Sequence, residues 1–363
     1  MRSTRVRGCC WLRQKNVSFE CMRIVAFLMV VFNHVFHYLF YGLDLSYEWN
    51  VTAVLMVIVK PAVPLFMMMS GALLLRREYS SKELRNKIIS VVVTLLLFSL
   101  VYFYFDPELK GTDQTFILLF LNGRVSNALW YMYVYLGFLL FLPFIKKMVD
   151  SFNEKDYRSF FLVLFLLSMF FPYLLRFLGA DISETDFFKF VFSPYLLYFV
   201  FGHYFINVKK ETLDLLKNRS YLLPLIYVGS VVLSALMIIT SRYNMMDFEL
   251  WNNKADSFQY GVMSVALFIM LARMRVSSRL IEKGSLFLGS KIYFAYLISD
   301  FVIHNLYVPL LQKFNSLSNV LVRFTVISIC IAVVCLVFSL IANALVDGCK
   351  QLIKSIKDKE QIA

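Results

Sequence analysis

The sequence predicts an all-α, polytopic membrane protein with about ten transmembrane helices and both termini in the cytoplasm. Hydrophobic residues make up 60% of the 363 residues and charged residues only 17%, which does not suit a water-soluble domain with one core. Apolar runs of about 20 residues recur along the chain, each long enough to cross a hydrocarbon layer about 30 Å thick. The Lys and Arg residues cluster between these runs, as topology signals do.

The distribution of positive charge supports the number and direction of the spans. When the linkers are assigned alternately to the two sides, 27 Lys and Arg fall on one side and five on the other. The side with more positive charge is the cytoplasm, and it holds both termini. The short run Phe116–Leu121 is too short to span and is predicted to lie at the interface. The predicted spans are 24–42, 51–75, 88–105, 129–146, 160–178, 187–206, 221–241, 257–272, 286–306 and 320–346.

One membrane domain is predicted to fill residues 23–346, between a basic cytoplasmic segment at 1–22 and a basic cytoplasmic tail at 347–363. The first span is long enough to stay as an anchor, so we expect no cleaved signal peptide and a location in the plasma (inner) membrane. The formal charge of +13 is spread over topology clusters, which argues against nucleic acid as a partner. The six cysteines show no metal-binding spacing, and no metal site is predicted.

The first span contains an arginine and a histidine that are costly in lipid. Arg23 and His34 are eleven residues apart, so on an α-helix they share a face to within about 20° and differ in depth by about 16 Å. With Arg23 at the cytoplasmic surface, His34 lies near the middle of the membrane. His34 is therefore a functional candidate, although it could instead hold the bundle together by a hydrogen bond. His37, one turn further along, could orient His34 or the acceptor, or simply pack.

The second span contains Pro61 and Pro64, which each remove a backbone donor and predict a kinked or broken helix. Broken backbone at membrane depth is tolerated where it lines a cavity, so this helix is predicted to line the pocket of His34. Lys60 lies at a depth comparable to that of Asp300 in the ninth span, and the two could form an ion pair. Asp300 could instead pair with His304, its neighbour one helical turn along.

The cytoplasmic linker after the second span has two interpretations. It contains Arg76, Arg77, Lys82, Arg85 and Lys87, and the positive-inside rule alone can account for them. The same residues could bind the phosphates of a cytoplasmic ligand, because guanidinium and ammonium groups match phosphate oxygens. Charge counting does not separate the two interpretations.

Several segments of the chain resemble acyltransferase family 3, the integral-membrane acyl-CoA-dependent O-acyltransferases of bacterial surface polysaccharides. FECMRIVAFLMVVFNHV is similar to the family's first-helix signature, with Arg23 and His34 at the matching positions. VPLFMMMSGALLL resembles the family segment that ends in Ser-Gly, here Ser70 and Gly71. Weaker similarities are LRNKII, ALWYMYVYLGFLLFLP, YFVFGHYF and KIYFAYLIS. In many members a histidine stands where this chain has Asp300.

The resemblance implies an O-acyltransferase that uses acetyl-CoA, or another acyl-CoA, as co-substrate and binds no permanent cofactor. The implied acceptor is a hydroxyl of a cell-envelope polysaccharide or of a lipid-linked sugar. His34 could act as a general base or as a nucleophile that forms an acyl-imidazole. The resemblance, together with the positions above, gives the candidates His34 and Arg23 for catalysis, Arg76, Arg77, Arg85, Lys87, Ser70 and Gly71 for donor binding, and His37, Lys60, Trp130 and Asp300 for the pocket or acceptor.

A secondary transporter, or an exporter of a lipid-linked glycan or small anionic substrate, is the alternative from a different class. Broken helices and charges near the membrane midplane are also how transporters bind substrates. Such transporters are built from repeats, and the second half of this chain has no convincing counterpart of the Arg23/His34 helix or of the Pro61/Pro64 break. The lack of internal symmetry favours the acyltransferase.

Overall fold

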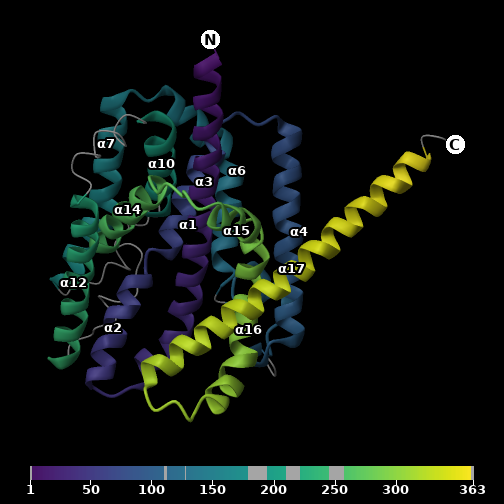
Figure 1. The fold of residues 1–363 in the computed structure, drawn as a ribbon. Coiled ribbons are helices and arrows are strands. Elements are labelled where there is room, and N and C mark those ends of the chain that lie inside the picture. Colours follow the sequence, from purple (N-terminus) through teal and green to yellow (C-terminus); the bar gives the residue numbers. More distant parts are fainter. Residues whose placement is uncertain are drawn as a thin grey trace.

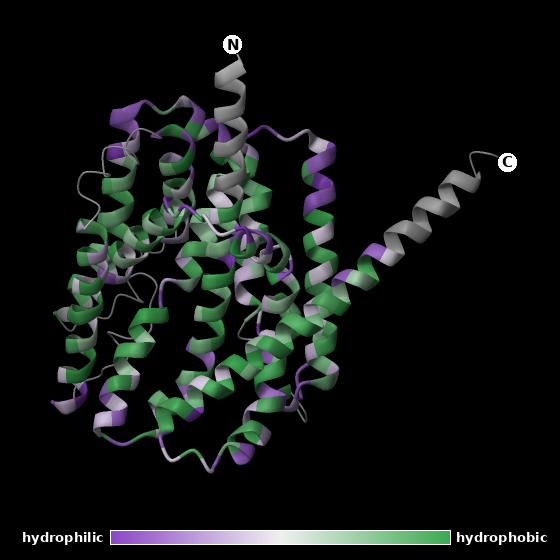
Figure 2. Cartoon of the chain, in the orientation of Figure 1, coloured by the Kyte–Doolittle hydropathy of each residue, from purple (hydrophilic) through white to green (hydrophobic). Residues whose placement is uncertain are grey.

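The computed structural model describes residues 2–109, 113–126, 128–178, 194–209, 221–244 and 257–360. Within these ranges the regular elements are all helical and no strand occurs, which confirms the predicted all-α class (Figure 1). Hydrophobic residues cover most of the bundle's length, and hydrophilic residues gather towards its two ends (Figure 2). Seven segments are long and apolar enough to cross a membrane, namely Val17–Gly42, Tyr47–Leu74, Ser81–Phe105, Trp130–Ser151, Leu222–Tyr243, Ile292–Lys313 and Val320–Gly348.

Three of the ten predicted spans, 160–178, 187–206 and 257–272, are not among these seven segments. The first coincides with α7 (Glu154–Phe165) and α8 (Phe171–Phe177), which a π-helical turn interrupts. The third is the 15-residue helix α14 (Phe258–Ala272), about 22 Å long and so shorter than the hydrocarbon core. The second lies partly outside the described residues. The count of ten and the cytoplasmic location of both termini stay predictions.

The first helix, α1 (Arg2–Gly42), runs through the middle of the bundle (Figure 1). Its polar side chains reach elements from both halves of the chain. The helix packs against α2 (Tyr47–Val59), α3 (Ala62–Leu74), α14, α15 (Arg279–Gly289), α16 (Ile292–Lys313) and α17 (Val320–Glu360). The predicted domain limits at residues 22 and 346 fall inside two continuous helices. The remaining α-helices are α4 (Ser81–Phe105), α5 (Phe116–Leu121), α6 (Trp130–Ser151), α10 (Pro194–His203) and α12 (Leu222–Tyr243).

The predicted break in the second span is confirmed. Helix α2 ends at Val59, Lys60 is its C-cap, and Pro61 is the N-cap of α3. Pro64 then falls in the first turn of α3, where a backbone N–H has no intrahelical partner in any case. Both prolines are therefore placed where a missing donor costs least.

Helices α3 and α10 approach each other through two glycines. A Cβ atom built on Gly71 would lie 1.7 Å from the backbone oxygen of Phe199, and one on Gly202 would lie 1.9 Å from that of Met68. Both contacts are with backbone, which cannot rotate away as a side chain can. Small residues that let helix backbones touch are a main source of association in membranes. The Ser-Gly segment of α3 therefore fixes α3 against α10.

Gly71→Ala is expected to destabilise the folded protein by about 2 kcal/mol or more, because the added methyl group must force α3 and α10 apart. Thermal unfolding in detergent measures the effect as a lowered Tm. Gly137→Ala is the matched control, since a Cβ there would meet no atom within 4 Å and alanine favours the helix. An equal Tm for the two variants would contradict the close approach.

Candidate active site

His34 lies beside a buried carboxylate of α16. Its Nδ1 atom is 4.0 Å from Oδ1 of Asp300. The side chain of Asp300 is only 3% exposed whereas that of His34 is 27% exposed, so a reactant can reach the imidazole and not the carboxylate. Ser126 donates a hydrogen bond of 2.8 Å to the other oxygen of Asp300. The carboxylate is thus held in place from a second element and faces the histidine.

A second histidine continues this network away from His34. Nε2 of His304 lies 3.5 Å from Asp300, which confirms the predicted pairing one helical turn apart. Nδ1 of the same ring is 2.8 Å from Asp106, the C-cap of α4, and Nε2 is 3.2 Å from Glu108 in the following 3₁₀ turn. Desolvation raises the pKa of Glu108, and the neighbouring His304 opposes this shift. The Asp300 carboxylate therefore stands between two imidazoles.

Of the two pairings left open for Asp300, the one with His304 is present in the described part of the chain and the ion pair with Lys60 is not. Among the described residues, Asp300 pairs with His304 and faces His34 instead. Lys60 is the C-cap at the helix break and is half-buried. Matching depth along two helices does not fix which faces meet, and His34 of α1 faces Asp300 instead. His37 is exposed, and its ring packs on Tyr41 with centroids 4.4 Å apart.

Arg23, at the other end of the same helix face, lines a cavity of about 380 Å³. Ser70 of α3 and Lys87 of α4 also line it, so the catalytic candidate Arg23 and two of the predicted donor-binding residues converge on one space. The hydroxyl oxygen of Ser70 is 3.2 Å from that of Tyr131. The cavity is otherwise rich in phenol rings and apolar groups, and its other lining residues are Phe66, Leu73, Leu74, Tyr79, Tyr131, Met132, Tyr135, Gly289, Ser290, Ile292, Tyr293 and Tyr296.

Glu20 holds the guanidinium of Arg23. The two side chains form an ion pair of 2.5 Å across one helical turn, and the carboxylate is 16% exposed. Its other oxygen, Oε2, is buried without a hydrogen-bond partner, and it lies 2.4 Å from where a Cβ on Gly289 would be. The close packing of α15 on α1 therefore fixes Glu20, and through it Arg23, at the rim of the cavity.

Three aromatic rings separate this cavity from the histidine site. Phe66, Tyr131 and Tyr296 are mutually in contact, with each pair of ring centroids 5.8 Å apart. Tyr296 precedes Asp300 by four residues, about 6 Å along α16. It also donates a hydrogen bond of 2.5 Å to the backbone oxygen of Ala128. The cavity therefore points towards His34 and is closed at that end by side chains.

The remaining predicted donor-binding residues, and the pocket candidate Trp130, lie elsewhere. Gly71 faces α10 rather than the cavity. Arg76 and Arg85 are exposed and do not line it, whereas Arg77 lines a smaller neighbouring cavity. Trp130 begins α6 and packs its ring on Tyr195 with centroids 5.3 Å apart. The basic linker is thus divided between cavities and solvent.

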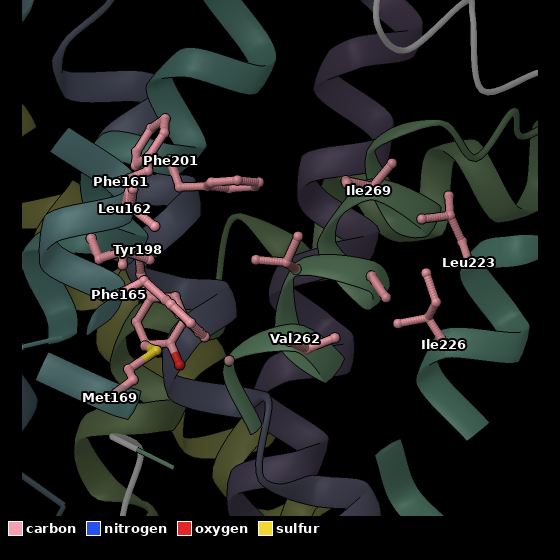
Figure 3. A pocket seen from close by; sticks show the side chains of 14 residues that line it. Phe161, Leu162, Phe165, Met169, Tyr198, Phe201, Leu223, Ile226, Val262 and Ile269 are labelled. Carbon is pink, nitrogen blue, oxygen red and sulfur yellow. The ribbon is translucent and has the colours of Figure 1, made fainter. Parts of the chain in front are cut away.

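A third cavity, of about 500 Å³, is lined by hydrophobic side chains (Figure 3). It lies between α7 and α10 on one wall and α12 and α14 on the other, and Figure 3 shows Phe161 and Phe201 opposite Ile269 and Leu223. None of its described lining residues carries a carboxylate, an amine or an imidazole. This space can hold hydrocarbon but cannot carry out acid–base chemistry, so the candidate active site is the one around His34.

Sequence reasoning missed Asp106, Ser126 and Glu108, which lie in short connections, and Glu20. Only Glu20 carried a usable signal, because a carboxylate three residues before an arginine lies on the same helix face. The other three reach the site through contacts 174 to 198 residues apart in the chain, which no local pattern reveals.

A family model described as an acyltransferase domain matches residues 16–342, nearly the whole chain. No curated protein and no solved structure matches the chain. The matched range includes both Arg23 and His34 and extends into α17.

Proposed function

Because the chain belongs to this family of membrane acyltransferases, we propose that it is an O-acyltransferase acting on a glycan of the cell envelope. It takes an acyl group, an acetyl group in the simplest case, from acyl-CoA on the cytoplasmic side. It transfers this group to a hydroxyl of a polysaccharide or of a lipid-linked sugar. The single observation that carries the proposal is one face of α1, with Arg23 in a cavity at one end and His34 beside Asp300 at the other.

The spacing on α1 matches the dimensions of the proposed donor. From the thioester sulfur of acyl-CoA to its first phosphorus there are about 13 bonds, and an extended chain advances about 1.2 Å per bond, or about 16 Å in total. The helical rise from Arg23 to His34 is also about 16 Å. A donor whose diphosphate pairs with Arg23 and Lys87 therefore brings its thioester to the depth of His34. The rings of Phe66, Tyr131 and Tyr296 would have to move to let it pass.

His34 is proposed to act as the general base. Its imidazole accepts the proton of the acceptor hydroxyl while that oxygen attacks the thioester carbonyl. The carbon–sulfur bond then breaks, and the thiolate of CoA takes up the proton from the imidazolium. Asp300 stabilises the positive charge that His34 carries between the two transfers, as a carboxylate behind a catalytic histidine does. Glycan ester and free CoA are the products.

Transfer of radioactive acetate tests the proposal. Membranes from cells that express the chain are incubated with acetyl-CoA labelled in the acetyl group, and label is counted in the glycan and lipid-linked sugar fractions. We expect base-labile label that is absent from membranes without the protein. A matching loss of acetyl mass from envelope glycans of a deletion strain would identify the acceptor. No transfer to either fraction would contradict the proposal.

Arg23→Gln is expected to raise KM for acetyl-CoA by about tenfold or more while kcat changes less, because a charge-assisted contact to phosphate is lost. Steady-state kinetics with varied acetyl-CoA measure this split. Lys283→Gln on α15 is the control, since that side chain is exposed and lies outside the cavity. An unchanged KM in the Arg23 variant would make the arginine a topology residue only.

A further inference from the structure

A smaller cavity of about 260 Å³ adjoins the cavity of about 380 Å³ that Arg23 lines, which we call the donor cavity. Tyr79 lines both spaces, so a ligand that passes its ring can occupy the two at once. The smaller cavity is formed by the linker between α3 and α4 and by the last turns of α6. Its lining residues are Arg77, Glu78, Tyr79, Leu84, Leu142, Pro143, Lys146, Lys147 and Asp150.

Three cations and two carboxylates line this smaller cavity, and the cations are unequally engaged. Lys146 is bound to Asp150 one helical turn away. Arg77 lies over the ring of Tyr79, 4.5 Å from its centroid, and 3.5 Å from Glu83. Lys147 is exposed and forms no hydrogen bond or ion pair with another described residue. Its ammonium group is therefore available to an anionic ligand at no cost in broken contacts.

The donor proposed above is longer than its own cavity. With its thioester at His34 and its diphosphate beside Arg23, acyl-CoA still carries an adenosine with a 3′-phosphate, which must lie on the far side of Arg23 from His34. The smaller cavity is the adjoining space there that offers both an aromatic ring and free positive charge. Aromatic rings bind purine bases by stacking, and lysine binds phosphate as a point charge.

We infer that the smaller cavity binds the 3′-phosphoadenosine end of acyl-CoA, with Lys147 and Arg77 at the 3′-phosphate and Tyr79 beside the adenine. The inference rests on the proposed function and adds to it the residues that recognise the nucleotide end of the donor. It also assigns opposite effects on phosphate binding to two side chains of α6. Lys147 attracts the 3′-phosphate, whereas Asp150 repels it and engages Lys146.

Binding of CoA and of 3′-dephospho-CoA to the purified full-length protein in detergent tests the inference without an acceptor. The wild-type protein is expected to bind CoA about tenfold or more tightly than 3′-dephospho-CoA. Lys147→Gln should reduce this ratio to about threefold or less and leave the affinity for 3′-dephospho-CoA unchanged. Asp150→Asn should raise the ratio by about two- to threefold. Arg158→Gln, an exposed arginine paired with Glu154, is the control and should keep the wild-type ratio.

The outcomes separate this inference from the proposed function. Equal affinities for the two nucleotides in the wild-type protein, or a full ratio in Lys147→Gln, would overturn the adenosine site and leave the donor proposal standing. Failure of both nucleotides to bind would overturn both. A lower ratio in Asp150→Asn would also contradict the inference. The inference predicts a higher ratio in this variant and a lower ratio in Lys147→Gln, whereas a purely structural role of the two side chains does not predict opposite changes.

Discussion

Membranes carrying His34→Ala are expected to lose acyl transfer by about 10³-fold or more. Removal of a positioned general base costs typically 10²–10⁴-fold, and the stabilisation that Asp300 gives to the imidazolium is lost with it. The variant should still fold. Asp300 keeps its hydrogen bond from Ser126 and its contact with His304, so the substitution leaves no buried charge without a partner. Transfer of labelled acetyl groups from acetyl-CoA to glycan measures the activity. Elution of the detergent-solubilised protein as a single species in size-exclusion chromatography shows whether the variant is folded.

His37→Ala is the matched control for this variant. It removes a second histidine one turn away on the same helix, whose ring packs on Tyr41 and takes no part in the Asp300 network. We expect activity within about threefold of the wild type, because packing at an exposed position contributes little. Full activity in His34→Ala would exclude His34 from the chemistry, and loss in both variants would point to damage to the helix instead.

Isotope exchange separates the two roles that an imidazole can play. A general base needs the acceptor present, whereas a nucleophile forms an acyl-imidazole and free CoA without it. Wild-type protein is therefore expected not to exchange labelled CoA into acetyl-CoA when no acceptor is added. Exchange that disappears in His34→Ala would assign covalent catalysis to the same residue.

Periodicity predicted those parts of the site that depend on one helix. Arg23 and His34 share a face because eleven residues make nearly a whole number of turns, and the break after Lys60 follows from two prolines. The i,i+4 pair of Asp300 and His304 is of the same kind. In each case the geometry is fixed by the helix itself, so a single sequence suffices.

Contacts between helices could not be obtained in this way. The sequence allowed two partners for Asp300, because it gives the depth of a residue along its helix. It does not give the rotation of each helix about its axis or which helices are neighbours. Asp106 reaches His304 only because α4 ends where α16 passes. Likewise, Gly71 belonged to a recognisable Ser-Gly pair, but the sequence does not reveal that Ser70 faces the cavity and Gly71 faces α10.

The number of spans shows a different limit. Hydropathy windows register apolar composition and not regular helix, so they joined α7 and α8 across a π-helical turn and counted the 15-residue helix α14 as a full span. A segment of that kind can be buried among other helices without crossing the bilayer alone. Charge alternation depends on the same windows, and thus could not reveal the difference.

Asp300→Asn is expected to lower kcat by about 10²-fold and to change KM for acetyl-CoA much less. Loss of the carboxylate behind a catalytic histidine costs up to about 10⁴-fold where the two are in direct contact, and the smaller figure reflects the 4.0 Å between Nδ1 of His34 and Oδ1 of Asp300. The asparagine keeps the volume and can still accept from Ser126. What it removes is the negative charge that stabilises the imidazolium.

Two further variants separate this charge effect from damage to the fold. Ser126→Ala removes one hydrogen bond to Asp300 but keeps the charge, so its loss in kcat should stay within about tenfold. Asp300→Glu keeps the charge on a longer side chain and should recover part of the activity that Asp300→Asn loses. Equal kcat in the wild type and Asp300→Asn would remove the carboxylate from the mechanism. Equal losses in all three variants would instead make Asp300 a packing residue, because two of the three variants keep its charge.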